Sequence, residues 1–162
     1  MTPLPQETIL VLDFGSQYTQ LIARRIREAR VYSEIVDSAI SAAEIRRRAP
    51  QGLVLSGGPA SVHDVGAPTV DPEIFKLGLP MLGVCYGLQL MTQRLGGRVQ
   101  RSGSREYGPA TITAAPDDPL FARLPAVSGV WMSHADEVTT LAPGFTAIAS
   151  SDRVPFSAVR CT

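Results

Sequence analysis

The sequence predicts an α/β protein with a doubly wound, mostly parallel sheet and an antiparallel flank. Between Thr8 and Leu95, apolar runs that suit buried parallel strands alternate with segments of helical periodicity. After Leu95, short β-like stretches follow one another without long helices between them, which is typical of antiparallel strands. The length of 162 residues suits one domain with a true hydrophobic core.

Each element has its own local signal. The run Thr8–Asp13 is continuously apolar and ends in an acid, as a buried strand does. The next helix shows apolar residues at helical spacing, and Ser41 with Glu44 three residues later forms a capping box. The strands expected in this half are 8–13, 31–36, 53–55 and 79–84, and the helices are 18–29, 41–48, one ending at Leu77, and 88–95. The strands expected in the second half are 98–101, 110–114, 129–132 and 146–149.

Composition and charge indicate which partners, cell compartment and metal sites to expect. Hydrophobic residues make up 44% of the chain and charged residues 19%, and the formal net charge is +0, so neither a nucleic acid nor an anionic membrane is an expected partner. Two cysteines without a disulfide framework, and no signal peptide or membrane-spanning run, favour the cytoplasm. Residues 1–7 are expected to form a flexible tail. The spacing of cysteines and histidines predicts no metal site.

Cys85 is the candidate nucleophile. It lies in Gly83-Val84-Cys85-Tyr86-Gly87, between an apolar strand and a helical pattern, which is the strand–turn–helix arrangement of a nucleophile elbow. The helix N-terminus beneath the sulfur is expected to favour the thiolate. A buried, inert cysteine is the alternative, and the flanking glycines argue against it.

Three turns that follow strands are expected to meet around this cysteine, because open α/β sheets bind ligands at the carboxyl ends of their strands. They are Asp13–Ser16, Ser56–Pro59 and Cys85–Gly87. Backbone N–H groups of the Gly57-Gly58 pair, with that of Tyr86, predict an oxyanion hole for a tetrahedral intermediate.

A cysteine hydrolase also needs a base, and the sequence indicates its position less clearly than that of the nucleophile. His63 lies in a polar loop and is expected to be exposed, whereas His134 follows an apolar segment and precedes Asp136 and Glu137. His134 with one of these acids is the only plausible internal base. A loop histidine that shapes the pocket through hydrogen bonds is an equally fair interpretation.

These segments resemble the class I glutamine amidotransferases, whose fold is flavodoxin-like. The resemblance runs from about residue 8 to about residue 156 and is carried by 10–21, 55–59, 83–89, 95–97, 105–108 and 130–136. Ser56-Gly57-Gly58-Pro59 and the cysteine elbow mark the whole family. The segments Asp13–Tyr18 and Trp131–His134 are similar to the glutaminase domains of GMP synthetases in particular.

The resemblance implies a glutaminase in which Cys85 attacks the side-chain amide of glutamine. It implies an oxyanion hole from the N–H groups of Gly58 and Tyr86, and contacts of Gln89 with the amino-acid end of glutamine. Ser133, His134 and Asp136 would line the same pocket, partly through their backbone. The ammonia would serve an ATP-dependent synthetase, the ATP pyrophosphatase domain, which aminates xanthosine monophosphate to GMP. This glutaminase domain would need no cofactor; ATP and Mg²⁺ would belong to the synthetase, fused or separate.

The chain departs from the family in lacking the His-Pro-Glu segment that supplies the base and its orienting acid. We therefore expect 8–162 to be an amidotransferase domain that is incomplete at its C-terminus, without the synthetase domain through which a homodimer would form. Ala135 stands where relatives commonly carry glycine. The alternatives are the glutaminase subunit of another class I amidotransferase, a non-catalytic module that binds glutamine or a partner, and a self-contained triad of Cys85, His134 and Asp136.

Overall fold

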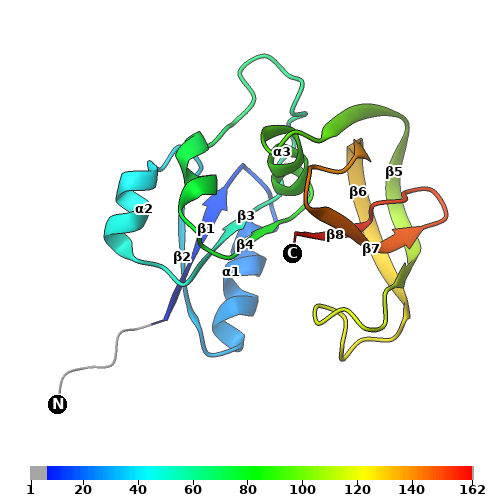
Figure 1. Cartoon of the computed structure of the whole chain (residues 1–162), viewed down its shortest axis with the longest axis horizontal. Helices are drawn as coiled ribbons and strands as arrows, with labels where there is room; N and C mark the ends of the chain where they lie inside the picture. The colour runs from blue at the N-terminus through cyan, green and yellow to red at the C-terminus, as the bar shows by residue number, and fades with distance from the viewer. Residues whose placement is uncertain (1–6, 162) are drawn as a thin grey trace. The chain divides into compact units, whose positions relative to one another are not determined.

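The chain divides into two compact units, residues 1–91 and residues 92–162 (Figure 1). The structure is a computed structural model that describes residues 7–161, with residues 102–106 described by their backbone alone. The expected tail, residues 1–7, lies outside the described residues apart from Glu7, which is exposed.

The first unit is built on a parallel sheet. Its strands are β1 (Thr8–Asp13), β2 (Tyr32–Asp37), β3 (Gly52–Leu55) and β4 (Met81–Gly83), in the order β2-β1-β3-β4. All three pairings are parallel, with Val11 beside both Ile35 and Val54. The chain thus leaves β1 first to one side of the sheet and then to the other, which places a topological switch point between β1 and β3.

Helices cover both faces of this sheet, which confirms the doubly wound prediction. The helices are α1 (Thr19–Glu28), α2 (Ala42–Arg48), the 3₁₀ helix η1 (Pro72–Lys76) and α3 (Tyr86–Arg94). Ala23 of α1 packs with Val11 and Val54 on one face. Side chains of α2, η1 and α3 pack on the alternate residues Leu10, Leu12, Leu53 and Leu55 on the other. The period of two along each strand separates the two cores.

The Ser41 half of the capping box predicted for α2 is confirmed. The Ser41 hydroxyl accepts a hydrogen bond from the Glu44 N–H at 3.2 Å. The Glu44 carboxylate accepts hydrogen bonds from Arg47 and Arg48, so it ties the first turn of the helix to the last. The helix ends at Arg48, and the residue that caps its C-terminus, Ala49, has a φ of +48°.

The second unit holds an antiparallel sheet of its own. Its strands are β5 (Arg98–Ala114), β6 (Val127–Thr140), β7 (Phe145–Ser151) and β8 (Ala158–Cys161), in the order β6-β5-β7-β8. The antiparallel sheet predicted from the sequence is confirmed, but three of its four expected strands differ in extent, and β8 lies outside the expected ranges. The ranges 98–101 and 110–114 are the two ends of the single strand β5, and β6 continues eight residues beyond Met132, to Thr140.

Ile112, Ala114 and Ala149 form the buried centre of the second unit. In the part of the chain that the structure describes, no helix is both long and apolar enough to cross a membrane.

Candidate active site

Three strand-to-loop turns of the first unit are joined at the carboxyl edge of the parallel sheet, as the sequence predicted. The buried Ser56 hydroxyl, after β3, accepts a hydrogen bond from the N–H of Phe14, after β1, at 3.1 Å. The rings of Phe14 and Tyr86 pack with their centroids 5.3 Å apart. The N–H of Val84, after β4, donates to the Leu55 carbonyl at 2.9 Å. Hydrogen bonds and ring packing therefore fix the three turns around one point.

Cys85 sits on the elbow between β4 and α3. Its φ is +53°, in the left-handed region that side-chain-bearing residues seldom adopt. The Cys85 carbonyl accepts a hydrogen bond from the Gln89 N–H at 3.0 Å, so the cysteine immediately precedes the first turn of the helix. This confirms the predicted strand–turn–helix arrangement and its local strain.

Gly87 allows this elbow to lie against β3. A Cβ added at Gly87 would overlap the Leu55 carbonyl oxygen and lie 2.7 Å from the Leu55 carbonyl carbon. The Gly87 N–H donates to the Ser56 carbonyl at 3.1 Å. Backbone thus packs on backbone at the turn that presents the nucleophile, and only glycine leaves room for that contact.

The electrostatic environment of Cys85 differs from the sequence-based expectation. Burial of the half-buried thiol raises the pKa of Cys85, and the N–H of Tyr86, which donates a hydrogen bond to the sulfur, lowers it by a smaller amount. The net shift of the Cys85 pKa is upward, whereas the helix N-terminus alone predicts a downward shift of that pKa.

Backbone donors predicted for the oxyanion hole border the cysteine. A Cβ added at Gly57 would lie 3.5 Å from the Cys85 Cβ, so the Gly57-Gly58 turn is a near neighbour of the cysteine. A Cβ added at Gly58 would meet the Phe14 carbonyl oxygen at 2.5 Å, so that position also excludes a side chain. Gln89, one helical turn after Cys85, is 8% exposed and lies in the same unit.

The sequence places Asp13 and Ser56 in two of the turns without assigning their side chains a role, and the structure shows that both side chains help to hold the turns. The Asp13 carboxylate accepts hydrogen bonds from the Gly15 N–H at 2.9 Å and the Thr19 hydroxyl at 2.8 Å. A polar residue at the end of a buried strand was the available signal. His63 is exposed in its loop, as predicted.

Ser133, His134 and Asp136 lie on β6, in the second unit, rather than in the loop expected from the sequence. Alternate residues of a strand face opposite sides. His134 is half-buried and Asp136 is 3% exposed, on one face of β6, and Ser133 is exposed on the other. Cys85 belongs to the first unit, so the Cys85, His134 and Asp136 triad stays a prediction, as do the binding roles of the three β6 residues.

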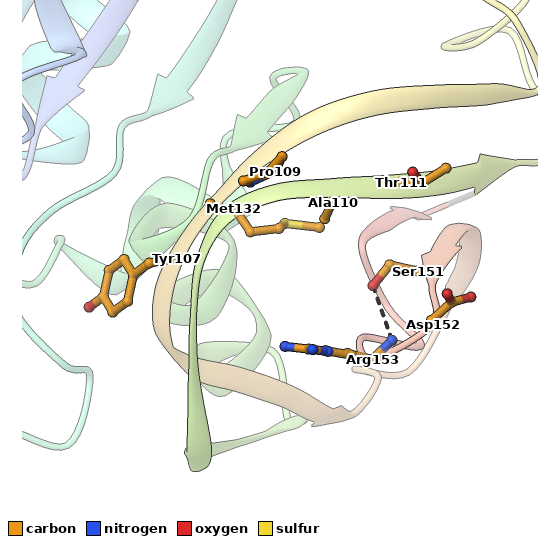
Figure 2. Close-up of a pocket in the computed structure, with 9 residues that line it drawn as sticks. Tyr107, Pro109, Ala110, Thr111, Met132, Ser151, Asp152 and Arg153 are labelled. Carbon is orange, nitrogen blue, oxygen red and sulfur yellow. Dashed lines mark hydrogen bonds between the residues drawn. The ribbon is translucent and has the colours of Figure 1, made fainter.

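The second unit also contains an open hollow of about 310 Å³ (Figure 2). Figure 2 shows Met132 and Arg153 on its wall, with the Arg153 N–H donating to the Ser151 hydroxyl at 3.4 Å. Its lining residues are Tyr107, Gly108, Pro109, Ala110, Thr111, Met132, Ser151, Asp152 and Arg153. They include none of the predicted site residues.

Known proteins are similar to this chain over most of its length. A family model described as Glutamine amidotransferase class-I matches residues 10–161. The chain is 56% identical over 154 residues to a protein of Staphylococcus aureus (strain JH9) named GMP synthase (glutamine-hydrolyzing). That match covers 95% of this chain and 30% of the length of the relative. The chain therefore spans less than a third of this curated relative.

Solved structures agree on the fold. A protein from Thermoplasma acidophilum described as a putative GMP synthase subunit is 28% identical with a TM-score of 0.85, over 98% of this chain and 80% of that one. A glutamine amidotransferase from Thermotoga maritima shares the fold with a TM-score of 0.75 at 20% identity, over 98% of this chain and 73% of that one.

Proposed function

The chain belongs to the class-I glutamine amidotransferase family, and on this premise we propose that it cleaves the side-chain amide of glutamine through a thioester at Cys85. The observation that carries the proposal is the elbow. Cys85 is held at a φ of +53° on a strand-to-helix turn that packs against the Gly57-Gly58 turn. This arrangement exposes a nucleophile beside backbone N–H groups, as acyl transfer requires.

In the proposed first step, the Cys85 sulfur attacks the amide carbon of glutamine. A C–S bond forms, and the carbonyl electron pair moves to the oxygen, which accepts hydrogen bonds from the Gly58 and Tyr86 N–H groups. The C–N bond then breaks, and the nitrogen leaves as ammonia after taking up a proton. Water hydrolyses the thioester, which releases glutamate and restores the thiol.

The raised pKa of Cys85 means that the attack requires a base to take the thiol proton. The family resemblance implies that a His-Pro-Glu segment supplies this base, and His134 with Asp136 is the alternative within the described residues. Gln89 is proposed to contact the amino-acid end of glutamine. Ser133, His134 and Asp136 are proposed to line the pocket.

We further propose that the ammonia serves an ATP-dependent synthetase that aminates xanthosine monophosphate to GMP. The 56% identity to a GMP synthase supports this acceptor over those of other amidotransferases. The relative is more than three times as long as the matched region, which accords with a synthetase partner, fused or separate, and ATP with Mg²⁺ would bind there. A cytoplasmic location is proposed on the same similarity.

The test is active-site labelling with 6-diazo-5-oxo-norleucine, a reactive glutamine analogue, read by peptide mass spectrometry. We expect an adduct on Cys85 that glutamine prevents and equimolar asparagine does not. Cys161, which is exposed, serves as an internal control for unselective alkylation. Labelling of both cysteines alike, or labelling that glutamine does not reduce, would contradict a glutamine pocket at Cys85.

A further inference from the structure

We propose that Ser56 is a positioning residue of the oxyanion hole, whose hydroxyl orients the Gly57–Gly58 peptide so that the Gly58 N–H faces the reacting carbonyl. This inference rests on the proposed function and adds to it a residue that does not itself touch glutamine. The evidence comes from hydrogen bonds, burial and the planarity of one peptide unit.

The Ser56 hydroxyl makes hydrogen bonds with two backbone groups. It is 0% exposed, accepts a hydrogen bond from the Phe14 N–H at 3.1 Å and donates its own to the Gly57 carbonyl at 2.9 Å. A hydroxyl has only one proton to donate, so the Phe14 N–H, by filling its acceptor side, fixes the direction of that donation. The Gly57 carbonyl is thereby turned toward the core.

The Gly57 carbonyl and the Gly58 N–H belong to the same peptide unit. In a planar trans peptide these two groups point in opposite directions, so a carbonyl held toward Ser56 directs the N–H away from it. Within residues 7–161, the Gly58 N–H has no hydrogen-bond acceptor. The donor is thus free for a ligand, and it follows a glycine whose missing side chain would point at Cys85, with an added Cβ 3.5 Å from the Cys85 Cβ.

The orientation of the Gly57–Gly58 peptide needs a fixing hydrogen bond because both residues are glycine. Two consecutive glycines lack the side chains that restrict backbone rotation, and a Gly–Gly peptide can flip at little steric cost. Without the Ser56 hydroxyl, the Gly57 carbonyl would be free to turn outward and present an oxygen where a donor is needed. Because the oxyanion exists only after attack, losing its donor weakens the tetrahedral adduct and leaves glutamine binding unchanged.

The experiment compares two probes of Cys85 in Ser56→Ala. Glutaric semialdehyde, a glutamine-length aldehyde, forms a thiohemiacetal whose oxyanion needs the hole, and its binding is read as protection of Cys85 from iodoacetamide. Alkylation by iodoacetamide passes through no oxyanion. We expect Ser56→Ala to weaken aldehyde protection by about tenfold or more. The alkylation rate without aldehyde is expected to stay within about twofold of wild type, because Cys85 makes no bond to Ser56.

Ser33→Ala is the matched control. Ser33 is also 0% exposed and donates to a backbone carbonyl, that of Ala23, at 2.8 Å. Removing either hydroxyl takes one buried hydrogen bond to a backbone carbonyl away, so a stability effect alone would appear in both variants. We expect aldehyde protection in Ser33→Ala to equal that of wild type. A second measurement uses ¹⁵N-labelled wild type, in which the Gly58 amide proton is expected to move downfield when the aldehyde is added.

The outcomes separate the two proposals. Equal aldehyde protection in Ser56→Ala and wild type, or an unmoved Gly58 resonance in the adduct, would overturn the role of Ser56 and leave the glutaminase proposal standing. Absence of aldehyde protection in a wild type that the diazo analogue labels would likewise overturn only the oxyanion geometry. If neither reagent reacts selectively at Cys85, the proposed function fails, and the role of Ser56 fails with it.

Discussion

Replacing Gly87 by alanine tests whether the nucleophile elbow depends on backbone-to-backbone contact. The added methyl group would lie 2.7 Å from the Leu55 carbonyl carbon and 2.8 Å from its Cβ, where ordinary contact begins near 3.4 Å. The start of α3 would have to move away from β3 by more than about 0.7 Å, because the Leu55 carbonyl oxygen is closer still, and the nearest atoms are backbone, not a flexible side-chain end.

The sign of the change in the free energy of unfolding of Gly87→Ala shows whether helix propensity or overpacking dominates. Helix propensity alone predicts that Gly→Ala in α3 stabilises the protein by up to about 1 kcal/mol. Overpacking against an immobile neighbour costs about 3 kcal/mol at the upper end of its usual range. We therefore expect a net loss of about 2 kcal/mol in the free energy of unfolding, and a lower rate of Cys85 labelling by the diazo analogue.

The assay is urea unfolding followed by far-UV circular dichroism, because α1 and α2 lie in the first unit and the one tryptophan, Trp131, lies in the second. Gly129→Ala is the control, since nothing lies within 4 Å of a Cβ added there. It is expected to be neutral or slightly stabilising. A Gly87→Ala protein that is as stable as wild type and labels equally fast would refute the reasoning.

Three further expectations follow from contacts of the first unit. Tyr86→Phe removes the hydrogen bond that the Tyr86 hydroxyl donates to the Pro68 carbonyl, and should lower the free energy of unfolding in urea by about 1 kcal/mol; an unchanged midpoint would contradict that expectation. The rate of Cys85 alkylation by iodoacetamide should rise with pH to a midpoint above 9.0, the ordinary pKa, because burial raises the pKa; a midpoint below 9.0 would show that the helix N-terminus prevails. Hydrogen bonds from two arginines lower the pKa of Glu44 from 4.5 to about 2, so its contribution to stability is present above pH 4.5 and is lost as the pH falls toward 2. The difference in Tm between wild type and Glu44→Gln should accordingly shrink over that range, and a constant difference would count against those ion pairs.

Local patterns were enough to predict the features that depend on neighbouring residues. The elbow at Cys85, the cap at Ser41 and the parallel strands each have a signal within a few residues, and the structure has all of them. The meeting of three turns also followed from the sequence, because strand ends of one parallel sheet share an edge.

Features that depend on distant partners could not be predicted in the same way. The segment from Ser133 to Thr140 is mixed in polarity and looks like a loop, yet it is a strand because it pairs with β5, as Tyr107 with Ser133. The upward shift of the Cys85 pKa depends on how deeply the elbow is buried. The orientation of the Ser56 hydroxyl depends on Phe14, 42 residues away.

The most direct test of the central claim is a single-turnover experiment with the chain in excess over ¹⁴C-labelled glutamine. After acid quench, label bound to protein and label in free glutamate are added together, so that acylation is counted whichever step is slow. We predict that this sum grows with time in wild type and in Cys161→Ala, and is absent in Cys85→Ala. A sum that grows in Cys85→Ala as fast as in wild type would contradict the assignment of Cys85 as the nucleophile.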